Sequence, residues 1–280
     1  MTSSERSLPV AVFDSGVGGL TVLHECLVSL PHEDFLYLGD TARFPYGDRE
    51  PGQLLAFARE LAEILLAEGA KLLVVACNSA TAAALPSLLA ELAGRVPVVG
   101  VVRPESRLAA KATISGRVGL LATPATVESG AYERALAEVA PHAELHAVPS
   151  AELAPLIQLG GEVDGRVVAC VEGACRPLKA AGVDTVILGC THYPLVRPVL
   201  QRELGRGVSI VSSGEAIAAE VEAELRAAGL ENDDARRGTY RFLASGDPTA
   251  FRRLGTRFLQ LPIEEVGHVE VELGGVRRAA

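Results

Sequence analysis

LLVVACNS, residues 72–79, is the stretch that decides the fold, and TVILGCTH, residues 185–192, repeats its plan. Each is a run of apolar, often β-branched residues that ends on a cysteine followed by small polar side chains. Such runs are typical of buried strands in parallel sheets, and ligands of open α/β folds bind beyond the carboxyl ends of those strands. Both thiols, Cys77 and Cys190, are therefore predicted to lie at a functional site.

Strands and helices alternate along the rest of the chain. Short apolar segments bounded by turn residues predict the strands, at residues 9–13, 35–38, 72–76, 97–102, 117–122, 144–148, 184–189 and 208–212. The clearest helix is 51–69, because a proline opens it, a glycine closes it and apolar residues recur at helical spacing. This alternation predicts an α/β fold with mainly parallel sheets wound by helices.

The repetition also predicts how the chain divides into domains. Asp14 and Thr123 each follow a predicted strand and precede one of the two cysteines by a similar interval. We therefore expect two pseudo-symmetric, doubly wound α/β domains with the active site in the cleft between them. The first domain comprises residues 1–102 and 206–280, and the second comprises residues 103–205. The segment after residue 206, with a helix at 214–228 and a strand near 240–243, should return to the first domain.

Charge and composition exclude several classes of partner. The net charge of −9 argues against a nucleic-acid surface or a polybasic membrane surface, which need clustered Lys and Arg. The apolar stretch before Asp14 is too short for a signal peptide. Polar residues and a proline interrupt the uncharged stretch 72–90, which argues against a membrane span. We expect a small-molecule substrate or a protein partner, and a homodimer is one assembly that the sequence allows.

The five cysteines are odd in number and lack the spacing of a disulfide scaffold or a zinc site, which predicts reduced thiols in the cytoplasm and no metal. A lone cysteine at a strand end is more often a small core residue, and Cys26, Cys170 and Cys175 are assigned to the core. Cys77 and Cys190 differ because they occupy matching places. Two thiols facing one cleft can take a proton from one side of a carbon and return one on the other.

The loop DSGVGG, residues 14–19, does not fit a nucleotide site. A Rossmann fingerprint would need a glycine at position 21, where the chain has Thr21, and no P-loop lysine follows. We expect instead that the glycines let backbone amides approach a small anionic substrate, with Asp14 and Ser15 pointing into the cleft. His192, two residues beyond Cys190, is placed to lower the pKa of that thiol or to relay its proton.

Four ordered motifs together resemble the glutamate racemase family, cofactor-independent enzymes that make D-glutamate for bacterial cell walls. They are DSGVGGLTVL at 14–23, GDTARFPYG at 39–47, ACNSAT at 76–81 and LGCTHYP at 188–194. SGDP at 245–248 is similar to the C-terminal segment of the family, so that the resemblance covers nearly the whole chain.

The resemblance implies a role for each matching residue. Cys77 would act on D-glutamate with support from Asp14, and Cys190 would act on L-glutamate with support from His192. The residues implied to line the pocket and hold the substrate are Asp14, Ser15, Pro45, Tyr46, Gly47, Asn78, Ser79, Thr123, Thr126, Thr191 and His192. Thr123 and Thr126 fit helix caps equally well.

The chain departs from the family pattern at two positions. Ser79 stands where many members have threonine, a change that keeps the hydroxyl. Gln158 stands where the family usually has a glutamate, and because an amide cannot take a proton, no acid/base role is expected there.

No cofactor is expected. Pyridoxal phosphate would need a lysine, and Lys71, Lys111 and Lys179 all lie outside the strand-end motifs. The chemistry then falls on two thiols whose ordinary pKa is about 8.5.

Other functions remain open at this stage. An aspartate racemase or a maleate isomerase would share the paired cysteines, with a different pocket around residues 45–47. A noncatalytic amino-acid binding protein would use the same cleft without needing both thiols. A thiol redox enzyme is disfavoured, because no resolving cysteine lies near Cys77 or Cys190 in the sequence.

Overall fold

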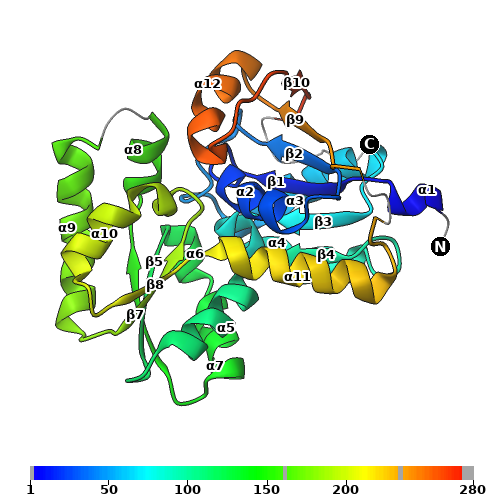
Figure 1. Ribbon diagram of the computed structural model, residues 1–280. Helices are drawn as coiled ribbons and strands as arrows, with labels where there is room; N and C mark the ends of the chain where they lie inside the picture. The colour runs from blue at the N-terminus through cyan, green and yellow to red at the C-terminus, as the bar shows by residue number, and fades with distance from the viewer. Residues whose placement is uncertain (1–2, 160–162, 233–235, 273–280) are drawn as a thin grey trace.

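The computed structural model describes residues 3–159, 163–232 and 236–272, and these residues form two parallel sheets surrounded by helices (Figure 1). The larger sheet has the strand order β10-β9-β2-β1-β3-β4, and the smaller one has the order β6-β5-β7-β8. Every strand pairing in both sheets is parallel. The α/β fold predicted from the alternating pattern is confirmed.

The strands of the larger sheet are β1 (Val10–Asp14), β2 (Phe35–Gly39), β3 (Leu72–Val75), β4 (Val98–Gly100), β9 (Tyr240–Ala244) and β10 (Gly267–His268). Those of the smaller sheet are β5 (Arg117–Ala122), β6 (Glu144–Pro149), β7 (Thr185–Gly189) and β8 (Ser209–Val211). The central strands β1, β2 and β3 are buried along their whole length because helices cover both faces of the sheet. The edge strand β6 is only half-buried.

The helices alternate with the strands along the chain. Those before the second sheet are α1 (Ser3–Arg6), α2 (Leu20–Ser29), α3 (Pro51–Ala67), α4 (Asn78–Glu91) and α5 (Val102–Ala112). Next come α6 (Pro124–Glu128), α7 (Ala131–Val139), α8 (Leu153–Leu159), α9 (Gly165–Ala180), the 3-10 turn η1 (Tyr193–Val196) and α10 (Arg197–Leu204). The last are α11 (Ser213–Ala228) and α12 (Pro248–Leu259). None of the helices in the described ranges is long and apolar enough to cross a membrane.

The predicted elements match the observed ones to within about two residues. Helix α3 ends at Ala67, two residues before the predicted end, because Gly69 there adopts a left-handed φ of 89° that breaks the helix. Strand β4 is shorter than the predicted 97–102, since α5 begins at Val102. After the second sheet the chain returns to the first, where β9 pairs with β2 and α11 packs against α2. The domain boundaries near residues 102 and 206 stay predictions.

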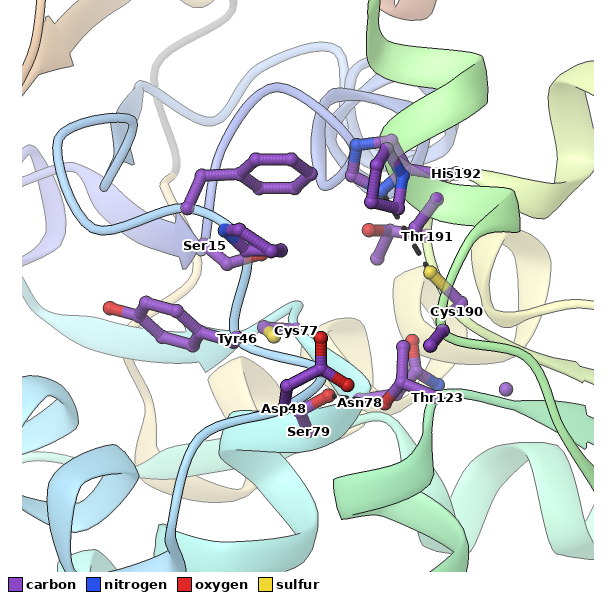
Figure 2. A pocket seen from close by; sticks show the side chains of 17 residues that line it. Ser15, Tyr46, Asp48, Cys77, Asn78, Ser79, Thr123, Cys190, Thr191 and His192 are labelled. Carbon is purple, nitrogen blue, oxygen red and sulfur yellow. Dashed lines mark hydrogen bonds between the residues drawn. The ribbon is translucent and has the colours of Figure 1, made fainter.

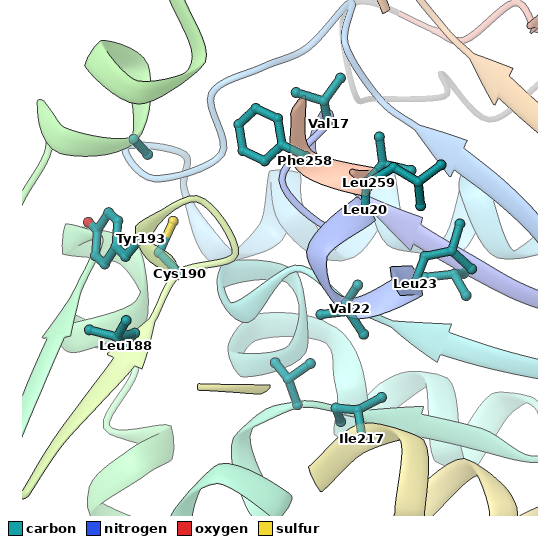
Figure 3. Close-up of a cluster of buried hydrophobic side chains, with 14 of the residues drawn as sticks. Val17, Leu20, Val22, Leu23, Leu188, Cys190, Tyr193, Ile217, Phe258 and Leu259 are labelled. Carbon is teal, nitrogen blue, oxygen red and sulfur yellow. The ribbon is translucent and has the colours of Figure 1, made fainter. Parts of the chain in front are cut away.

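One apolar cluster joins the two sheets. It runs from α2 and α12 on one side to β7 and η1 on the other, and Figure 3 shows Leu20 and Phe258 together with Leu188 and Tyr193 in this cluster. All four side chains are fully buried. The larger sheet has a further cluster on its other face, between the strands and helices α3 and α4. The ends of β3 and β7 are thus held at fixed places in one packed body.

We expect Phe251→Ala to lower the free energy of unfolding by about 3–5 kcal/mol. Phe251 lies in α12, is 1% exposed, and packs against the rings of Tyr37 and Phe242 at centroid distances of 5.9 and 6.5 Å. Urea unfolding followed by circular dichroism measures the change. The control is Val28→Ala on α2, where a side chain that is 65% exposed should change the same quantity by less than about 0.5 kcal/mol. Equal effects of the two changes would contradict a stabilising role for α12.

Candidate active site

A small pocket lies at the carboxyl ends of strands from both sheets. Cys77 follows β3 and is the N-cap residue of α4, while Cys190 follows β7 and precedes η1. Figure 2 shows these two cysteines on opposite sides of the pocket. The residues that line it are Ser15, Phe44, Pro45, Tyr46, Gly47, Asp48, Cys77, Asn78, Ser79, Thr123, Ala151, Ala154, Pro155, Gly189, Cys190, Thr191 and His192. The enclosed space of about 20 Å³ has room for about one water molecule.

The structure brings nearly all the predicted site residues together in this wall. The exceptions are Asp14 and Thr126, which lie directly behind it. The sequence prediction overlooked the pocket-lining residues Phe44, Asp48, Ala151, Ala154, Pro155 and Gly189. Phe44, Asp48 and Gly189 are adjacent to predicted site residues, and this adjacency is the signal that could have identified them. Ala151, Ala154 and Pro155 have apolar side chains that give no such signal.

Burial is the main cause of the raised pKa of the Cys77 thiol. Its side chain is 5% exposed, and burial together with the nearby charge of Asp14 raises the pKa of Cys77 to about 12. Hydrogen bonds from the backbone of Ala80 and from Ser15 oppose this rise only in part. A thiol with this pKa is protonated at neutral pH.

Cys190 has His192 as its neighbour. Burial also raises the pKa of Cys190, and its sulfur lies 3.8 Å from Nδ1 of His192. On the far side of the ring, Nε2 of His192 lies 2.9 Å from Oε1 of Gln158. Because burial lowers the pKa of His192 to about 3, the imidazole is neutral. An acceptor at Nε2 assigns the proton to that nitrogen, which leaves the Nδ1 lone pair facing the Cys190 thiol.

One glycine of the loop 14–19 lets two loops pack closely. A Cβ atom on Gly18 would clash with Oγ1 of Thr191 and with the His192 ring, so this glycine lets the loop after β1 touch the loop after β7. The amide of Gly16 donates to Asp14 Oδ2 at 3.0 Å, within the loop itself. The approach of backbone amides in this loop to a substrate stays a prediction.

Asp14 is fully buried behind the pocket wall, so the expectation that it points into the cleft is wrong. Its carboxyl accepts from the hydroxyl of Thr191 at 3.3 Å as well as from Gly16, and burial raises its pKa. No hydrogen bond joins Asp14 to Cys77 among the described residues. Asp14 thus influences that thiol through its charge, while its hydrogen bonds tie the two loops together.

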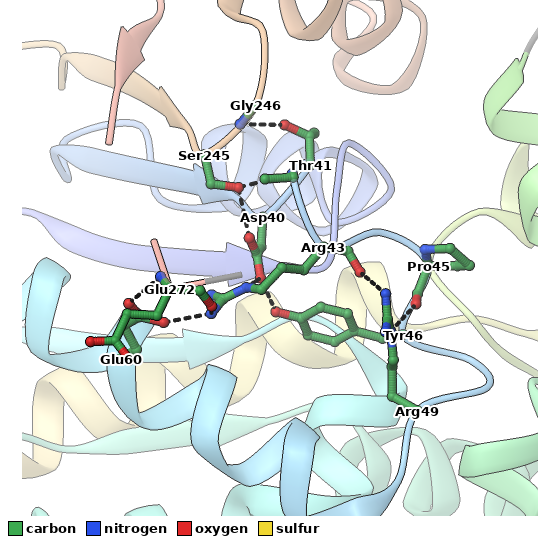
Figure 4. Close-up of polar contacts among 11 residues, drawn as sticks. Asp40, Thr41, Arg43, Pro45, Tyr46, Arg49, Glu60, Ser245, Gly246 and Glu272 are labelled. Atoms are coloured by element: carbon green, nitrogen blue, oxygen red, sulfur yellow. Dashed lines mark hydrogen bonds and ion pairs between the residues drawn. The ribbon is translucent and has the colours of Figure 1, made fainter. Parts of the chain in front are cut away.

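The loop that carries residues 45–47 is held by the buried carboxylate of Asp40 (Figure 4). Asp40 accepts from Nε of Arg43 at 2.6 Å, from the hydroxyl of Ser245 at 2.6 Å and from the hydroxyl of Tyr46. Arg43 also donates to Glu60 at 2.5 Å. The hydroxyl of Tyr46 is therefore committed to Asp40, and this residue offers the pocket its ring instead of a donor.

Three hydroxyls form a closed triangle at the opposite wall. Ser79 lies 2.9 Å from Thr123 and 3.0 Å from Thr126, and the two threonines are 3.0 Å apart. Thr123 occupies the N-cap position of α6, but its hydroxyl makes no capping hydrogen bond. The alternative interpretation of these threonines as caps is therefore wrong for Thr123. The triangle contains as many hydrogen bonds as hydroxyl hydrogens, so Ser79 and Thr123, the two that line the pocket, donate to an anionic group there only when they turn from the triangle.

Comparison with known proteins identifies relatives over almost the whole chain. The model of the Asp/Glu/Hydantoin racemase family matches residues 29–221, a span that includes both pocket cysteines. The glutamate racemase of Beutenbergia cavernae is 45% identical over 277 residues, which cover 95% of this chain and 94% of that protein.

Solved structures of glutamate racemases also match this chain. The glutamate racemase isoform RacE1 of Bacillus anthracis matches with a TM-score of 0.90 at 38% identity, covering 95% of this chain and 98% of that one. The glutamate racemase of Francisella tularensis, solved in complex with D-glutamate, matches with a TM-score of 0.87 at 29% identity, covering 97% of this chain and 100% of that one.

We expect Gln158→Glu to raise the pKa of His192 by about one to three units, because a carboxylate beside Nε2 favours the imidazolium form. In the unchanged protein the ring should stay neutral across the range in which the protein is folded, since burial holds its pKa at about 3. NMR of ¹⁵N-labelled histidine as a function of pH measures both values. Gln53→Glu at the start of α3 adds the same charge away from the pocket and should leave His192 unchanged. An unchanged pKa of His192 in Gln158→Glu would contradict the electrostatic account.

Proposed function

This chain belongs to the Asp/Glu/hydantoin racemase family and is an isomerase that racemises amino acids, and we propose that its substrate is glutamate and that Cys77 and Cys190 move the α-proton. The observation that carries this proposal is the pair of buried thiols in one pocket, each at the end of a strand from a different sheet. The full-length similarity to glutamate racemases, one of them solved with D-glutamate, supports the choice of substrate.

The proposed reaction breaks and forms only C–H and S–H bonds. In the direction from L- to D-glutamate, the Cys190 thiolate takes the proton from Cα. The Cys77 thiol then delivers its own proton to the opposite face of the carbanion. The products are D-glutamate, a Cys190 thiol and a Cys77 thiolate, and the reverse direction exchanges the two roles. Solvent protons reset the pair between turnovers.

Each thiol has to lose its proton before it can act as a base. Burial opposes this step, because it raises the pKa of both thiols. The ammonium group of the substrate brings a positive charge that stabilises a thiolate. For Cys190, Nδ1 of His192 at 3.8 Å is placed to accept a hydrogen bond from the thiol and to orient it, since a ring with a pKa of about 3 is too weak a base to take the thiol proton. For Cys77, the buried carboxyl of Asp14 raises the pKa of the thiol further, which makes the thiolate a stronger base once it has formed.

Neutral groups hold the substrate in this proposal. The residues that line the pocket include no Lys or Arg. In this proposal the hydroxyls of Ser79, Thr123 and Thr191 turn from the hydrogen bonds that they make within the protein and donate to the carboxylates of glutamate. Asn78 differs from them, because its Oδ1 atom is buried without a hydrogen-bond partner among the described residues. That acceptor matches the ammonium group, the only strong donor of glutamate near Cα.

We also propose a cellular context. D-glutamate made by this enzyme would supply peptidoglycan synthesis in the cytoplasm. The five cysteines, all within the described residues, are free, which supports a reducing compartment. The division into domains of residues 1–102 with 206–280 and residues 103–205 belongs to the same proposal, because each of these domains would supply one of the two thiols.

We expect Cys77→Ala and Cys190→Ala each to lower kcat by about two to four orders of magnitude in both directions, since each removes the acid or base for one face. Circular dichroism of L-glutamate with the purified, cofactor-free protein measures the rate, and parallel reactions with L-aspartate test the substrate. Cys170→Ala is the matched control, because this half-buried thiol lies outside the pocket. Retention of more than about a tenth of the activity by either pocket variant would reject the assignment.

Turnover in deuterated water tests the two-base geometry directly. We expect the first-formed D-glutamate from L-glutamate to carry deuterium at Cα, because the delivering thiol has exchanged with solvent. The remaining L-glutamate should keep its proton at low conversion, and the same should hold in reverse. Mass spectrometry of the separated enantiomers measures both pools. Substantial protium in the product would instead indicate one base that serves both faces.

A further inference from the structure

A buried carboxyl that does not line the pocket lies behind Asn78. Glu105 projects from α5, is fully buried, and forms no ion pair with a Lys, Arg or His among the described residues. Burial raises its pKa to about 7, and hydrogen bonds from Ser213, Tyr132 and Asn78 lower it in part. A buried acid without a cationic partner is costly, and the proton transfers described above make no use of it.

Both hydrogens on the amide nitrogen of Asn78 are used in hydrogen bonds within the protein. Nδ2 of Asn78 donates to the Tyr132 hydroxyl at 2.7 Å and to Oε2 of Glu105 at 3.2 Å, which uses both of its hydrogens. The Oδ1 atom is left buried and without a partner in the described part of the chain. Since Asn78 lines the pocket, where Figure 2 labels it, the oxygen end of the amide is the end available to a ligand.

Glu105 in its ionised form, which the hydrogen bonds from Ser213, Tyr132 and Asn78 favour, can only accept, and it decides which end of the amide that is. The two ends of an asparagine amide have nearly the same shape, so packing alone hardly distinguishes them. Tyr132 does not distinguish them either, because a hydroxyl can donate or accept. The Tyr132 hydroxyl, however, donates to Glu105 and can therefore only accept from Asn78. A reversed amide would place its oxygen against the oxygens of both neighbours.

We propose that Glu105 is a positioning residue that fixes the Asn78 amide with its oxygen toward the substrate ammonium group, and that it thereby sets the preference of the pocket for ligands with a donor at Cα. This inference rests on the proposed function only in naming glutamate as the ligand. The orientation of the amide follows from the contacts of Glu105, Tyr132 and Asn78 alone. Glu105 and Tyr132 act through Asn78 and do not touch the substrate.

The test compares glutamate with glutarate, which has the same two carboxylates and lacks the ammonium group. In Glu105→Gln the new amide can face Asn78 with either a donor or an acceptor, so the orientation of Asn78 is no longer imposed. We expect KM for both enantiomers of glutamate to rise about tenfold or more, with a smaller change in kcat. The binding of glutarate, measured by calorimetry, should stay unchanged. The ratio of the glutarate to the glutamate dissociation constant should therefore fall about tenfold.

Two controls separate positioning from a general structural role. Tyr132→Phe also removes hydrogen bonds from this cluster but leaves Glu105 to orient the amide, and it should keep the ligand ratio within about threefold. Glu33→Gln changes another buried carboxyl, paired with Lys71 away from the pocket, and should leave KM and the ratio unchanged. If Glu105→Gln does not fold, Glu105→Asp and Glu105→Leu replace it. The carboxylate variant should then keep the ratio and the apolar variant should lose it.

An unchanged ratio in Glu105→Gln, or in Glu105→Leu where that variant is used, overturns the inference, as does an equal fall of the ratio in Glu33→Gln. Failure of the proposed function looks different. In that case the unchanged protein would not racemise glutamate, and the calorimetric ratio of glutamate to glutarate binding would still report the orientation of Asn78.

Discussion

Removal of water from two thiols is the constraint on which the rest of this structure depends. A thiol inside the protein is harder to ionise than one in water, and Cys77 and Cys190 both show this rise in pKa. The same burial makes the thiolate a stronger base once it forms. A proton on Cα of an amino acid is only weakly acidic, so that added base strength is useful. As a consequence, both thiols stay protonated unless a positive charge, such as the ammonium group of the substrate, lies beside them.

The groups around the thiols fit this constraint because none of them carries a fixed positive charge, and no Lys or Arg lines the pocket. His192 is held neutral by burial, and its partner Gln158 is an amide that adds no charge. A cation fixed beside either sulfur would ionise it permanently and would make it a weaker base. With neutral surroundings, the ammonium group of the substrate supplies the charge only when it is bound. The glutamine at position 158, a departure from the family pattern, is consistent with this arrangement.

The sequence predicted the framework better than the contacts within it. Apolar runs and their turn residues were sufficient to place the strands, and the repeated cysteine motif placed both thiols at strand ends. The errors concern side chains whose partners are distant in the sequence. Asp14 turns toward Thr191 instead of into the cleft, because buried polar groups must find partners. The sequence also gives no sign that the hydroxyl of Tyr46, a residue correctly predicted to line the pocket, donates to Asp40. Spacing along the chain carries no information about such pairs, which depend on how the two sheets meet.

Glu105 is a second example of a residue whose partners are distant in the sequence. Nothing around it in the sequence marks it as part of a site, since it sits on a helix that opens with VRPES. Its importance arises only when α5 brings it against Asn78 and Tyr132, both far from it in the chain. The pocket wall then consists of two layers with different tasks. The inner layer offers thiols, hydroxyls and one amide oxygen to the ligand, while the outer layer of Asp14, Asp40 and Glu105 uses buried carboxyls to decide which way those groups face. Because an ionised carboxylate can only accept, a buried acid in that form imposes one polarity on its neighbours, and a site without cations can still be ordered in this way.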